Sequence, residues 1–316
     1  MAAKKTFEEK ELGFGSKTSG QKTRLINKDG TFNVNRIEKS RWRSMSIYHA
    51  LITMSWRKFN TFVVCYFVAI NLVFALLYYS TGMEGLKGVE AVSEFDKFLE
   101  AFFFSTQTFS TVGFGRISPS GHLTSTIAAI ESLAGLLGFA IATGLLYGRF
   151  SRPKARILFS ENAIIAPFKE GKAFQFRMAN KMRNSQISDI ECRVTVAILE
   201  DNNGTPIRRF RPLELEVKRI IFFPMTWTIN HPIDENSPLY GMSENDMKAA
   251  DVEFMINLVG FDDTFSQTVT SRSSFTHEEL IYGAKWVSVF GLTADGQTVQ
   301  DLNNLSSYEL YKFEDA

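Results

Sequence analysis

The sequence SEFDKFLEAFFFSTQTFSTVGFGRISP, residues 93–119, decides the fold of this 316-residue chain. In its first part, apolar residues recur on one helical face, which predicts a helix over residues 94–108. A helix of about 15 residues reaches only about 22 Å, too short to cross a bilayer. The stretch STVGFG, residues 110–115, then places irregular, glycine-containing backbone inside an otherwise apolar region.

Two long apolar segments flank this stretch. FNTFVVCYFVAINLVFALLYY, residues 59–79, carries no charge, and LTSTIAAIESLAGLLGFAIATGLLYG, residues 123–148, carries only Glu131. The first would be about 32 Å long as a helix, enough to cross a bilayer core of about 30 Å. We therefore predict two membrane spans with a re-entrant pore helix between them. Small residues in the second span permit close helix contact and bending, so we expect hinges at Gly135 and Gly144.

Basic residues predict the orientation of the two spans. They are frequent before the first span and after the second, and rare in the connection 80–122. We therefore expect a multi-pass protein with both termini in the cytoplasm. The first 40 residues contain no apolar core that would serve as a cleavable signal peptide, and we expect them to form a disordered or extended cytoplasmic N-terminus.

The residues Thr111-Val112-Gly113-Phe114-Gly115 resemble the potassium-channel filter signature Thr-Val-Gly-Tyr-Gly. Non-helical backbone at membrane depth is tolerated only inside protein or beside a water-filled pore. Glycines allow successive carbonyl oxygens to face one direction, where they replace the hydration shell of K⁺. We predict K⁺ binding at Thr111, Val112, Gly113 and Phe114. One chain supplies a quarter of such a ring, so the function requires a homotetramer.

Other interpretations of this stretch were weighed. Gly113-Phe114-Gly115 also begins a dinucleotide-binding pattern, but Ser118 stands at the third glycine position. A simple loop of a membrane anchor would carry the same residues. Phe114 replaces the tyrosine of the signature and lacks its hydroxyl, so a nonselective cation channel of the same architecture remains the alternative prediction.

Residues 151–316 show strand-like alternation between turn signals, in QFRMANK (175–181), ECRVTVAILE (191–200), KRIIFFPMTWTI (218–229), DVEFMINLVG (251–260) and KWVSVFGL (285–292). No long helices alternate with these segments. We predict a membrane pore domain over 41–150 and an all-β, immunoglobulin-like cytoplasmic sandwich over 151–316.

Four separated motifs resemble the inward-rectifier potassium channels, most closely their prokaryotic KirBac branch. They are YHALITMSW (48–56), GRFSRPKARILFSENAII (148–165), HPIDENSPLYGMSENDM (231–247) and LVGFDDTFSQTVTSRSSF (258–275). The resemblance extends from about residue 40 to 310. It implies a tetrameric channel in a prokaryotic inner membrane, with the all-β domain extending the pore. We also expect the chain to be classed with the voltage-gated channels. The eukaryotic members' outer cysteines are missing from residues 80–122.

The resemblance also implies roles for residues of the inner helix. Phe139, Thr143 and Tyr147 share one helix face, and Tyr147 falls where the family's inner helices constrict, so a ring of tyrosines would form an apolar gate. Ordinary helix packing is the simpler interpretation of that face. Phe139 replaces the acidic residue of strong rectifiers, which predicts weak block by polyamines. Residues 46–56 would form an amphipathic slide helix on the inner membrane surface.

Three residues are expected to support the filter: Gln107, Arg116 and Glu131. The family often has a glutamate behind the filter in the pore helix, where this chain has Gln107. Glu131 is an ionisable group at membrane depth, a feature that usually has a function. We expect Arg116 to pair with Glu131 and hold the filter from behind.

Basic residues near the inner membrane face are expected to bind phosphoinositide or another anionic lipid. They are Arg57, Lys58, Arg149, Arg152, Lys154 and Arg156. The alternative is that they set topology alone. In the all-β domain, Gly260 to Ser266 matches the family's cytoplasmic constriction, where Asp262 and Asp263 would concentrate cations. A solvated turn is the alternative for this loop.

Composition and the remaining motifs exclude other classes. The 35 Lys and Arg residues balance 34 Asp and Glu residues, so no basic excess indicates a nucleic-acid partner. Cys65 and Cys192 are far apart in the sequence and predict two free thiols. GFGSKTSG (13–20) only partly matches a phosphate-binding loop. We find no nucleophile–base set or metal spacing of an enzyme; a membrane-anchored binding or sensor protein remains the alternative from another class.

Overall fold

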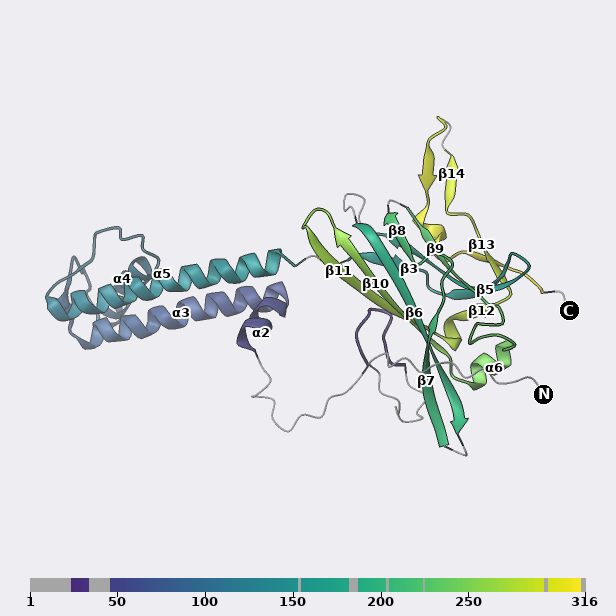
Figure 1. Ribbon diagram of the computed structural model, residues 1–316. Coiled ribbons are helices and arrows are strands. Elements are labelled where there is room, and N and C mark those ends of the chain that lie inside the picture. Colours follow the sequence, from purple (N-terminus) through teal and green to yellow (C-terminus); the bar gives the residue numbers. More distant parts are fainter. Residues whose placement is uncertain are drawn as a thin grey trace. The chain divides into compact units, whose positions relative to one another are not determined.

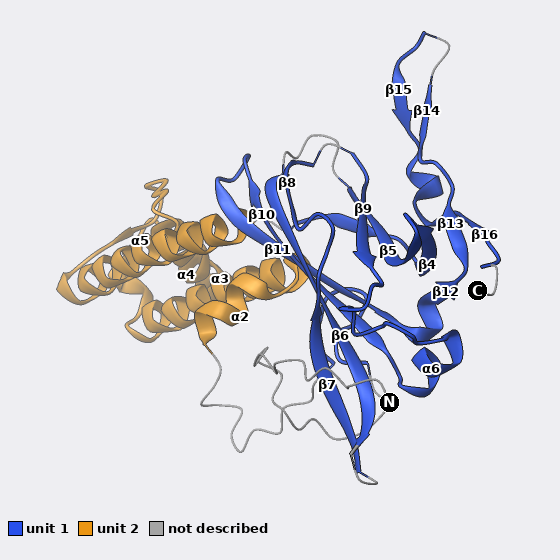
Figure 2. Ribbon diagram, turned by 45° about the vertical axis from the view of Figure 1, so that its right-hand side comes forward, with its two compact units in different colours: residues 1–37, 153–316 blue, residues 38–152 orange. Residues whose placement is uncertain are grey.

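The computed structural model describes residues 24–33, 46–152, 155–181, 187–202, 205–223, 225–292 and 295–313. The chain divides into two compact units, one of residues 38–152 and one of residues 1–37 with 153–316 (Figure 2). The helical unit therefore ends two residues beyond the expected limit at residue 150. The beginning of the chain belongs with the C-terminal unit.

The helical unit consists of five helices and a short two-stranded ladder among the described residues. The elements are α2 (Ile47–Thr53), α3 (Trp56–Ser80), η1 (Met83–Gly85), β1 (Leu86–Lys87), α4 (Glu94–Phe109), β2 (Ser118–Pro119) and α5 (His122–Phe150). Helices α3 and α5 are long and apolar enough to cross a membrane. They run side by side with α4 beside them at one end (Figure 1). The expected pair of spans and the short helix between them are confirmed.

Local sequence fixes where these helices begin. The Ser93 hydroxyl accepts a hydrogen bond from the amide of Asp96, and the Asp96 carboxylate accepts one from the amide of Ser93. This reciprocal capping starts α4 at Glu94. Ser46 caps α2, and Ser55 caps α3 in the same way from its side chain. Ser55 lies between the two helices and starts α3 afresh, so α2, within the expected slide helix, is a distinct element.

The core of the helical unit lies between α3, α4 and α5. Its buried residues are Phe74, Ala75, Tyr78, Leu86, Ala101, Phe104, Ile117 and Ala128. The rings of Tyr78 and Phe104 meet edge to face with centroids 4.9 Å apart. Alanines at 75, 101 and 128 let the helices approach closely at this level.

The C-terminal unit is an all-β domain built from two five-stranded sheets. The first sheet has the order β11-β10-β6-β7, with β8 also paired to β6; the second has the order β12-β4-β5-β3, with β9 also paired to β5. The pairs are antiparallel except β12 with β4, which is parallel. The expected run 218–229 is therefore two strands, β8 and β9, that belong to different sheets.

Not every strand shows the expected alternation, because residues 173–179 of β5 are all buried. The strands of the two sheets are β3 (Ile157–Phe159), β4 (Ala163–Phe168), β5 (Gly171–Asn180), β6 (Ile187–Asn202), β7 (Thr205–Leu213), β8 (Arg219–Phe222), β9 (Trp227–Pro232), β10 (Glu253–Asp262), β11 (Gln267–Thr276) and β12 (Leu280–Tyr282). Short elements complete the domain: α6 (Glu244–Ala249), η2 (His277–Glu279), β13 (Ala284–Trp286), β14 (Phe290–Leu292), β15 (Thr298–Gln300), η3 (Leu302–Ser306) and β16 (Tyr308–Leu310).

One hydrophobic core joins the two sheets. Phe174 and Phe176 of β5 meet Phe254 of β10 and Phe275 of β11, and all four side chains are fully buried. The rings of Phe174 and Phe254 stack with centroids 3.9 Å apart. Because the two faces interdigitate through large aromatic side chains, the sheets form one packed domain.

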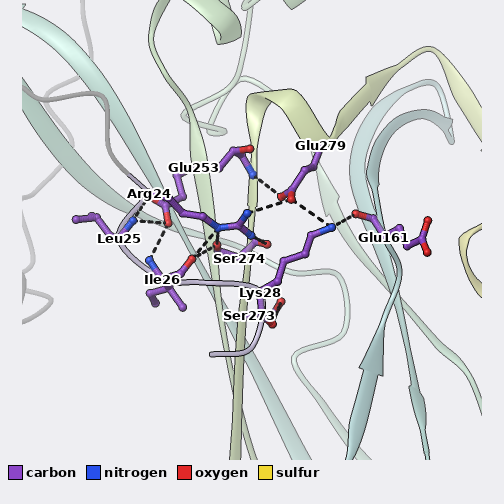
Figure 3. A network of polar contacts seen from close by, with 10 residues as sticks. Arg24, Leu25, Ile26, Lys28, Glu161, Glu253, Ser273, Ser274 and Glu279 are labelled. Carbon is purple, nitrogen blue, oxygen red and sulfur yellow. Dashed lines mark hydrogen bonds and ion pairs between the residues drawn. The ribbon is translucent and has the colours of Figure 1, made fainter. Parts of the chain in front are cut away.

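Residues 24–33 pack against this all-β domain (Figure 3). The carboxylate of Glu253 accepts hydrogen bonds from the amides of Leu25 and Ile26 at 3.0 and 3.1 Å. The Arg24 guanidinium bonds the carbonyl of Ser274 at 2.7 Å and the carboxylate of Glu279 at 3.0 Å. Within the stretch 1–40, which we expected to be disordered or extended, this segment is thus docked on the sheet. The remainder of that stretch, including GFGSKTSG, lies outside the described residues.

Candidate functional site

The candidate filter begins where α4 ends. The amides of Val112 and Gly113 both donate to the main-chain carbonyl of Gln107, at 3.0 and 3.2 Å. The amide of Phe114 donates to the side-chain oxygen of Gln107 at 3.0 Å. One residue of α4 therefore fixes three successive amides of the candidate filter. The sequence singled out Gln107, but only the structure gives this double role.

Positive φ angles give the stretch its shape. Gly113 has φ 59° and Gly115 has φ 85°, values at which a side chain would be strained. Thr111 has φ 60°, an uncommon value for a β-branched residue. Among the described residues, no donor bonds the carbonyl oxygens of Thr111 to Gly115. The N–H groups thus turn toward α4, whereas the carbonyls stay available for another partner.

The far end of the filter is held by the short ladder and by an ion pair. Strand β1 pairs with β2, and the guanidinium of Arg116 pairs with the carboxylate of Glu100 on α4. A Cβ atom on Gly88 would lie 1.8 Å from the carbonyl oxygen of Arg116, so only glycine fits beside the filter exit. Sequence reasoning missed Glu100 and Gly88. For Glu100, the available signal in the sequence was its position next to the apolar face of α4.

The expected pair between Arg116 and Glu131 is wrong. Arg116 is committed to Glu100, and it is about half exposed. Glu131 is completely buried and contacts the hydroxyls of Tyr78 and Ser105 instead. The reason is position: Glu131 lies among α3, α4 and α5 behind the pore helix, whereas Arg116 follows the filter. Tyr78 and Ser105 are further residues that the sequence did not indicate.

Comparison with known proteins agrees with this geometry over nearly the whole described chain. Residues 26–153 match the model of the inward rectifier potassium channel transmembrane domain, and residues 157–313 match that of the inward rectifier potassium channel C-terminal domain. The chain belongs to the inward rectifier potassium channel family. This family consists of ion channels of the membrane, not enzymes.

Relatives from distant organisms support the assignment. The chain is 35% identical over 291 residues to the inward rectifier potassium channel Kirbac3.1 of Paramagnetospirillum magnetotacticum, covering 91% of this chain and 96% of that protein. It is 25% identical to the human ATP-sensitive inward rectifier potassium channel 12, over 85% of this chain and 66% of that protein. For the inward rectifier potassium channel irk-1 of Caenorhabditis elegans, the identity is 24% over 84% of this chain and 53% of that protein. The resemblance to the prokaryotic branch is thereby confirmed.

The residues expected at the channel gate lie on one exposed face of α5. Phe139 is 75% exposed and Tyr147 is 74% exposed within the chain. The Thr143 hydroxyl donates to the carbonyl of Phe139 at 2.9 Å, so it is satisfied within its own helix. None of these three side chains belongs to the buried core of the helical unit, which leaves the face free for a pore or a second copy.

The two expected hinge glycines differ. A Cβ atom on Gly135 would lie 2.0 Å from the carbonyl oxygen of Phe109, at the end of α4. Gly135 is therefore explained by close packing of the inner helix against the pore helix. At Gly144 no atom lies within 4 Å of a Cβ position. Of these two glycines, only Gly144 has no packing explanation among the described residues.

The expected lipid-binding cations also separate. Arg149 donates to the carbonyls of Leu51 and Met54 at 2.6 and 2.8 Å and lies over the rings of Trp56 and Phe59. Arg149 joins the end of α5 to the α2–α3 junction. Both terminal amino groups of its guanidinium are therefore engaged within the chain and less available to lipid. Other members of the set are exposed: Arg57, Lys58, Arg152 and Arg156. Lys154 lies outside the described residues.

The expected cytoplasmic constriction is a structured turn. Asp262 is only 3% exposed, and its carboxylate accepts hydrogen bonds from the amides of Thr264 and Phe265. Asp263 accepts one from the hydroxyl of Ser188 at 2.9 Å. A Cβ atom on Gly260 would come within 2.9 Å of the side chains of Ile187 and Ile190. The expectation that Asp262 presents its charge to a permeation path is therefore wrong, because backbone amides of the β10–β11 turn bind that carboxylate.

Proposed function

We propose that the chain forms a homotetrameric potassium channel in which the carbonyl oxygens of Thr111, Val112, Gly113 and Phe114 bind dehydrated K⁺ around a fourfold axis. The observation that carries this proposal is that main-chain amides and main-chain carbonyls of the filter have different environments. The amides of Val112, Gly113 and Phe114 are bonded to Gln107, while the carbonyls of the filter have no partner among the described residues. Carbonyl oxygens without internal partners are tolerated at membrane depth when they face ions or water.

The pore helix contributes to the same chemistry. The C-terminal end of α4 carries a partial negative charge and precedes the filter directly. Four such ends directed at a common axis would stabilise a cation in the cavity below the filter. A hollow of about 400 Å³ beside the filter, lined by Phe67, Phe103, Val112 and Phe114 among others, supports the presence of a neighbouring copy there. Exposed aromatic side chains at this depth require either lipid or protein against them.

Conduction would be controlled at the opposite end of α5. Tyr147 and Phe139 expose large apolar side chains on one face, and a ring of four tyrosines can block ions by dewetting. Anionic lipid, including phosphoinositide, would bind the exposed cations Arg57, Lys58 and Arg152, together with Lys154 and Arg156. Arg149 would act indirectly, because it fixes the position of α2.

The proposal places the chain in the inner membrane of a prokaryote, with both termini and the immunoglobulin-like β domain in the cytoplasm. Asp263 stays a candidate for the cytoplasmic constriction. Sensing of voltage is not part of the proposal. Residues 59–80 and 122–148 of the two long helices contain a single Asp, Glu, Lys or Arg, which is Glu131. The spans therefore hold no row of basic side chains that would move in the membrane field.

Flux measurements test the function directly. The full-length chain in liposomes is expected to take up ⁸⁶Rb⁺ or thallium, with little inhibition by excess Na⁺. Uptake that Na⁺ abolishes equally well would favour the alternative, a nonselective cation channel, for which the missing hydroxyl of Phe114 is the specific argument. Purified protein that behaves as a monomer, or liposomes without flux, would contradict the channel proposal and favour a membrane-anchored binding protein.

A further inference from the structure

A buried polar cluster joins the three main helices of the membrane unit. It consists of Asn71 and Tyr78 on α3, Ser105 on α4 and Glu131 on α5, and each of these residues is 0% exposed. The Tyr78 hydroxyl lies 2.6 Å from Glu131 Oε2. Ser105 Oγ lies 3.0 Å from Asn71 Oδ1 and within hydrogen-bond distance of Glu131 Oε1. Glu131 is the one ionisable Asp, Glu, Lys or Arg of the two spans, so the positions of the hydrogens in this cluster matter.

The orientation of Asn71 fixes the first step of the hydrogen-bond chain. Asn71 Nδ2 lies 2.7 Å from the carbonyl oxygen of Phe67, which can only accept. The amide must therefore point its nitrogen toward Phe67 and its oxygen toward Ser105. The oxygen Asn71 Oδ1 in turn can only accept, and the Ser105 hydroxyl is the donor that faces it.

Counting hydrogens then decides the state of Glu131. The Ser105 hydroxyl has one hydrogen, and Asn71 Oδ1 receives it. Ser105 Oγ can then only accept on the side of Glu131 Oε1. An ionised carboxylate has no hydrogen to give, so two oxygen atoms would face each other without one. A carboxylic acid supplies the missing hydrogen from Oε1, while its Oε2 accepts from the Tyr78 hydroxyl.

The surroundings of Glu131 lead to the same conclusion. No Lys, Arg or His among the described residues makes an ion pair with it, and Arg116 pairs with Glu100. The groups that face it are uncharged: Tyr78 from α3 and Ser105 from α4. On α5 itself, Glu131 is the only Asp, Glu, Lys or Arg before Arg149. A buried carboxylate without a cation would carry a large desolvation penalty.

We propose that Glu131 is a neutral carboxylic acid that positions the pore helix through a directed chain of hydrogen bonds, from Tyr78 to Glu131 to Ser105 to Asn71 to the carbonyl of Phe67. This inference deepens the proposed function and rests on it, because the value of a fixed pore helix lies in the filter that it supports. Ser105 lies two residues before Gln107, whose oxygens hold the filter amides. Glu131 is thus a positioning residue that acts on the filter through α4.

The matched variants follow from the donor count. Glu131→Gln replaces the acid by a neutral group of the same shape, whose amide donates to Ser105 and whose oxygen accepts from Tyr78. Glu131→Ala removes both bonds and leaves a gap. For the full-length channel in liposomes, we expect Glu131→Gln to keep ⁸⁶Rb⁺ uptake and its preference over Na⁺ within about twofold, and Glu131→Ala to lose about tenfold of that preference, because buried polar partners are left unsatisfied.

Infrared spectroscopy measures the protonation state of Glu131 directly, independently of any effect on the structure. At neutral pH, the wild-type protein is expected to show the C=O absorption of a buried protonated carboxylic acid, shifted in D₂O and missing in Glu131→Gln. Equal spectra of the two proteins in that region would overturn the proposal, as would a Glu131→Gln variant as impaired as Glu131→Ala. If Glu131→Ala fails to assemble, the spectrum and the Glu131→Gln flux still decide. Absence of flux in the wild type would instead contradict the proposed function, and the spectrum would remain interpretable.

Discussion

The side-chain oxygen of Gln107 accepts the amide hydrogen of Phe114 at 3.0 Å, so the last turn of α4 is directly bonded to the proposed filter. Gln107→Leu removes this acceptor and leaves the Phe114 amide without a partner, at a cost of about 1–3 kcal/mol. We expect the variant to lose about tenfold of its preference for K⁺ over Na⁺. Thallium uptake into liposomes with Na⁺ competition measures this.

The control for this prediction is Gln107→Glu, which keeps an oxygen in the same place. It is expected to retain selectivity close to that of the wild type, since a carboxyl group in either protonation state keeps an oxygen that accepts the amide hydrogen. If Gln107→Leu selected K⁺ as well as Gln107→Glu, the contact with Phe114 would have no role in the filter.

The packing of Gly135 predicts a contrast between two glycines of the same helix. In Gly135→Ala the added methyl group would lie 2.0 Å from the carbonyl oxygen of Phe109, so α4 or α5 must move. We expect a loss of about 1–3 kcal/mol, as for other overpacked sites, and a lower melting temperature of the detergent-solubilised channel. In Gly144→Ala the added methyl group meets no atom of the described residues within 4 Å, apart from the nearby backbone of its own helix. This variant should keep or slightly raise stability, because alanine favours a helix by about 1 kcal/mol over glycine.

The same pair separates packing from bending. If Gly144 is a hinge of the inner helix, Gly144→Ala should lower ⁸⁶Rb⁺ uptake although its melting temperature does not fall. Equal melting temperatures for both alanine variants would contradict the packing explanation of Gly135.

The contacts of Arg149 predict how α2 is held. Its guanidinium donates to the carbonyls of Leu51 and Met54 at 2.6 and 2.8 Å, a fork that lysine cannot reproduce. We expect Arg149→Lys to weaken the docking of α2 by about 1.5–3 kcal/mol, the contribution of hydrogen bonds to a charged group. Hydrogen exchange at the amides of Ile47–Thr53 measures it. Arg152→Gln removes an exposed charge and should leave that exchange unchanged. Equal effects of both variants would show that the two hydrogen bonds of Arg149 have no specific role in holding α2.

The sequence predicts those parts of the channel that depend on one-dimensional patterns. Segment length and the absence of charge give α3 and α5, and the filter residues form a contiguous motif. The partners of Arg116, Glu131 and Arg149 were not predictable in this way, because each pair joins segments separated in the chain. Positive charge near a span end fits both lipid binding and an internal contact, and Arg149 shows that geometry decides between them. The burial of Asp262 likewise depends on a turn conformation that alternation of residues does not specify.

The N-terminal segment provides a further test of the all-β domain. Arg24 bonds both Ser274 and Glu279, and it is less exposed than Lys28, which also pairs with Glu279 (Figure 3). We expect Arg24→Gln to raise hydrogen exchange at the amides of Leu25 and Ile26 about tenfold, because the segment loses charge-assisted hydrogen bonds. Lys28→Gln is the matched control and should have a smaller effect, since a half-exposed ion pair contributes little. Unchanged exchange in Arg24→Gln would mean that Glu253 holds the segment without help.

The buried His231 predicts a pH dependence of the stability of the all-β domain. Its Nδ1–H donates to the carbonyl of Glu214 at 2.6 Å, and its Nε2 accepts from the hydroxyl of Ser237 at 2.8 Å. Both contacts are those of the neutral imidazole, and burial lowers the pKa of His231 below its ordinary value of 6.5. Above pH 6.5 neither the folded nor the unfolded chain protonates this side chain. As the pH falls below 6.5, the unfolded chain binds a proton first, so stability is lost at up to about 1.4 kcal/mol per pH unit until the folded pKa is reached.

Cys192 reports this effect within the intact chain, because its thiol is buried at 1% exposure in the core of the same domain. In a Cys65→Ser background, the rate at which a thiol reagent modifies Cys192, divided by the rate for the denatured chain at the same pH, measures opening of the domain. Opening is expected to increase between pH 6.5 and 5 in the chain with His231 and to increase less in His231→Gln, which stays neutral. Since carboxylates elsewhere titrate equally in both proteins, their difference isolates His231. Parallel pH profiles would show that the imidazole is protonated equally easily in the folded and unfolded chain.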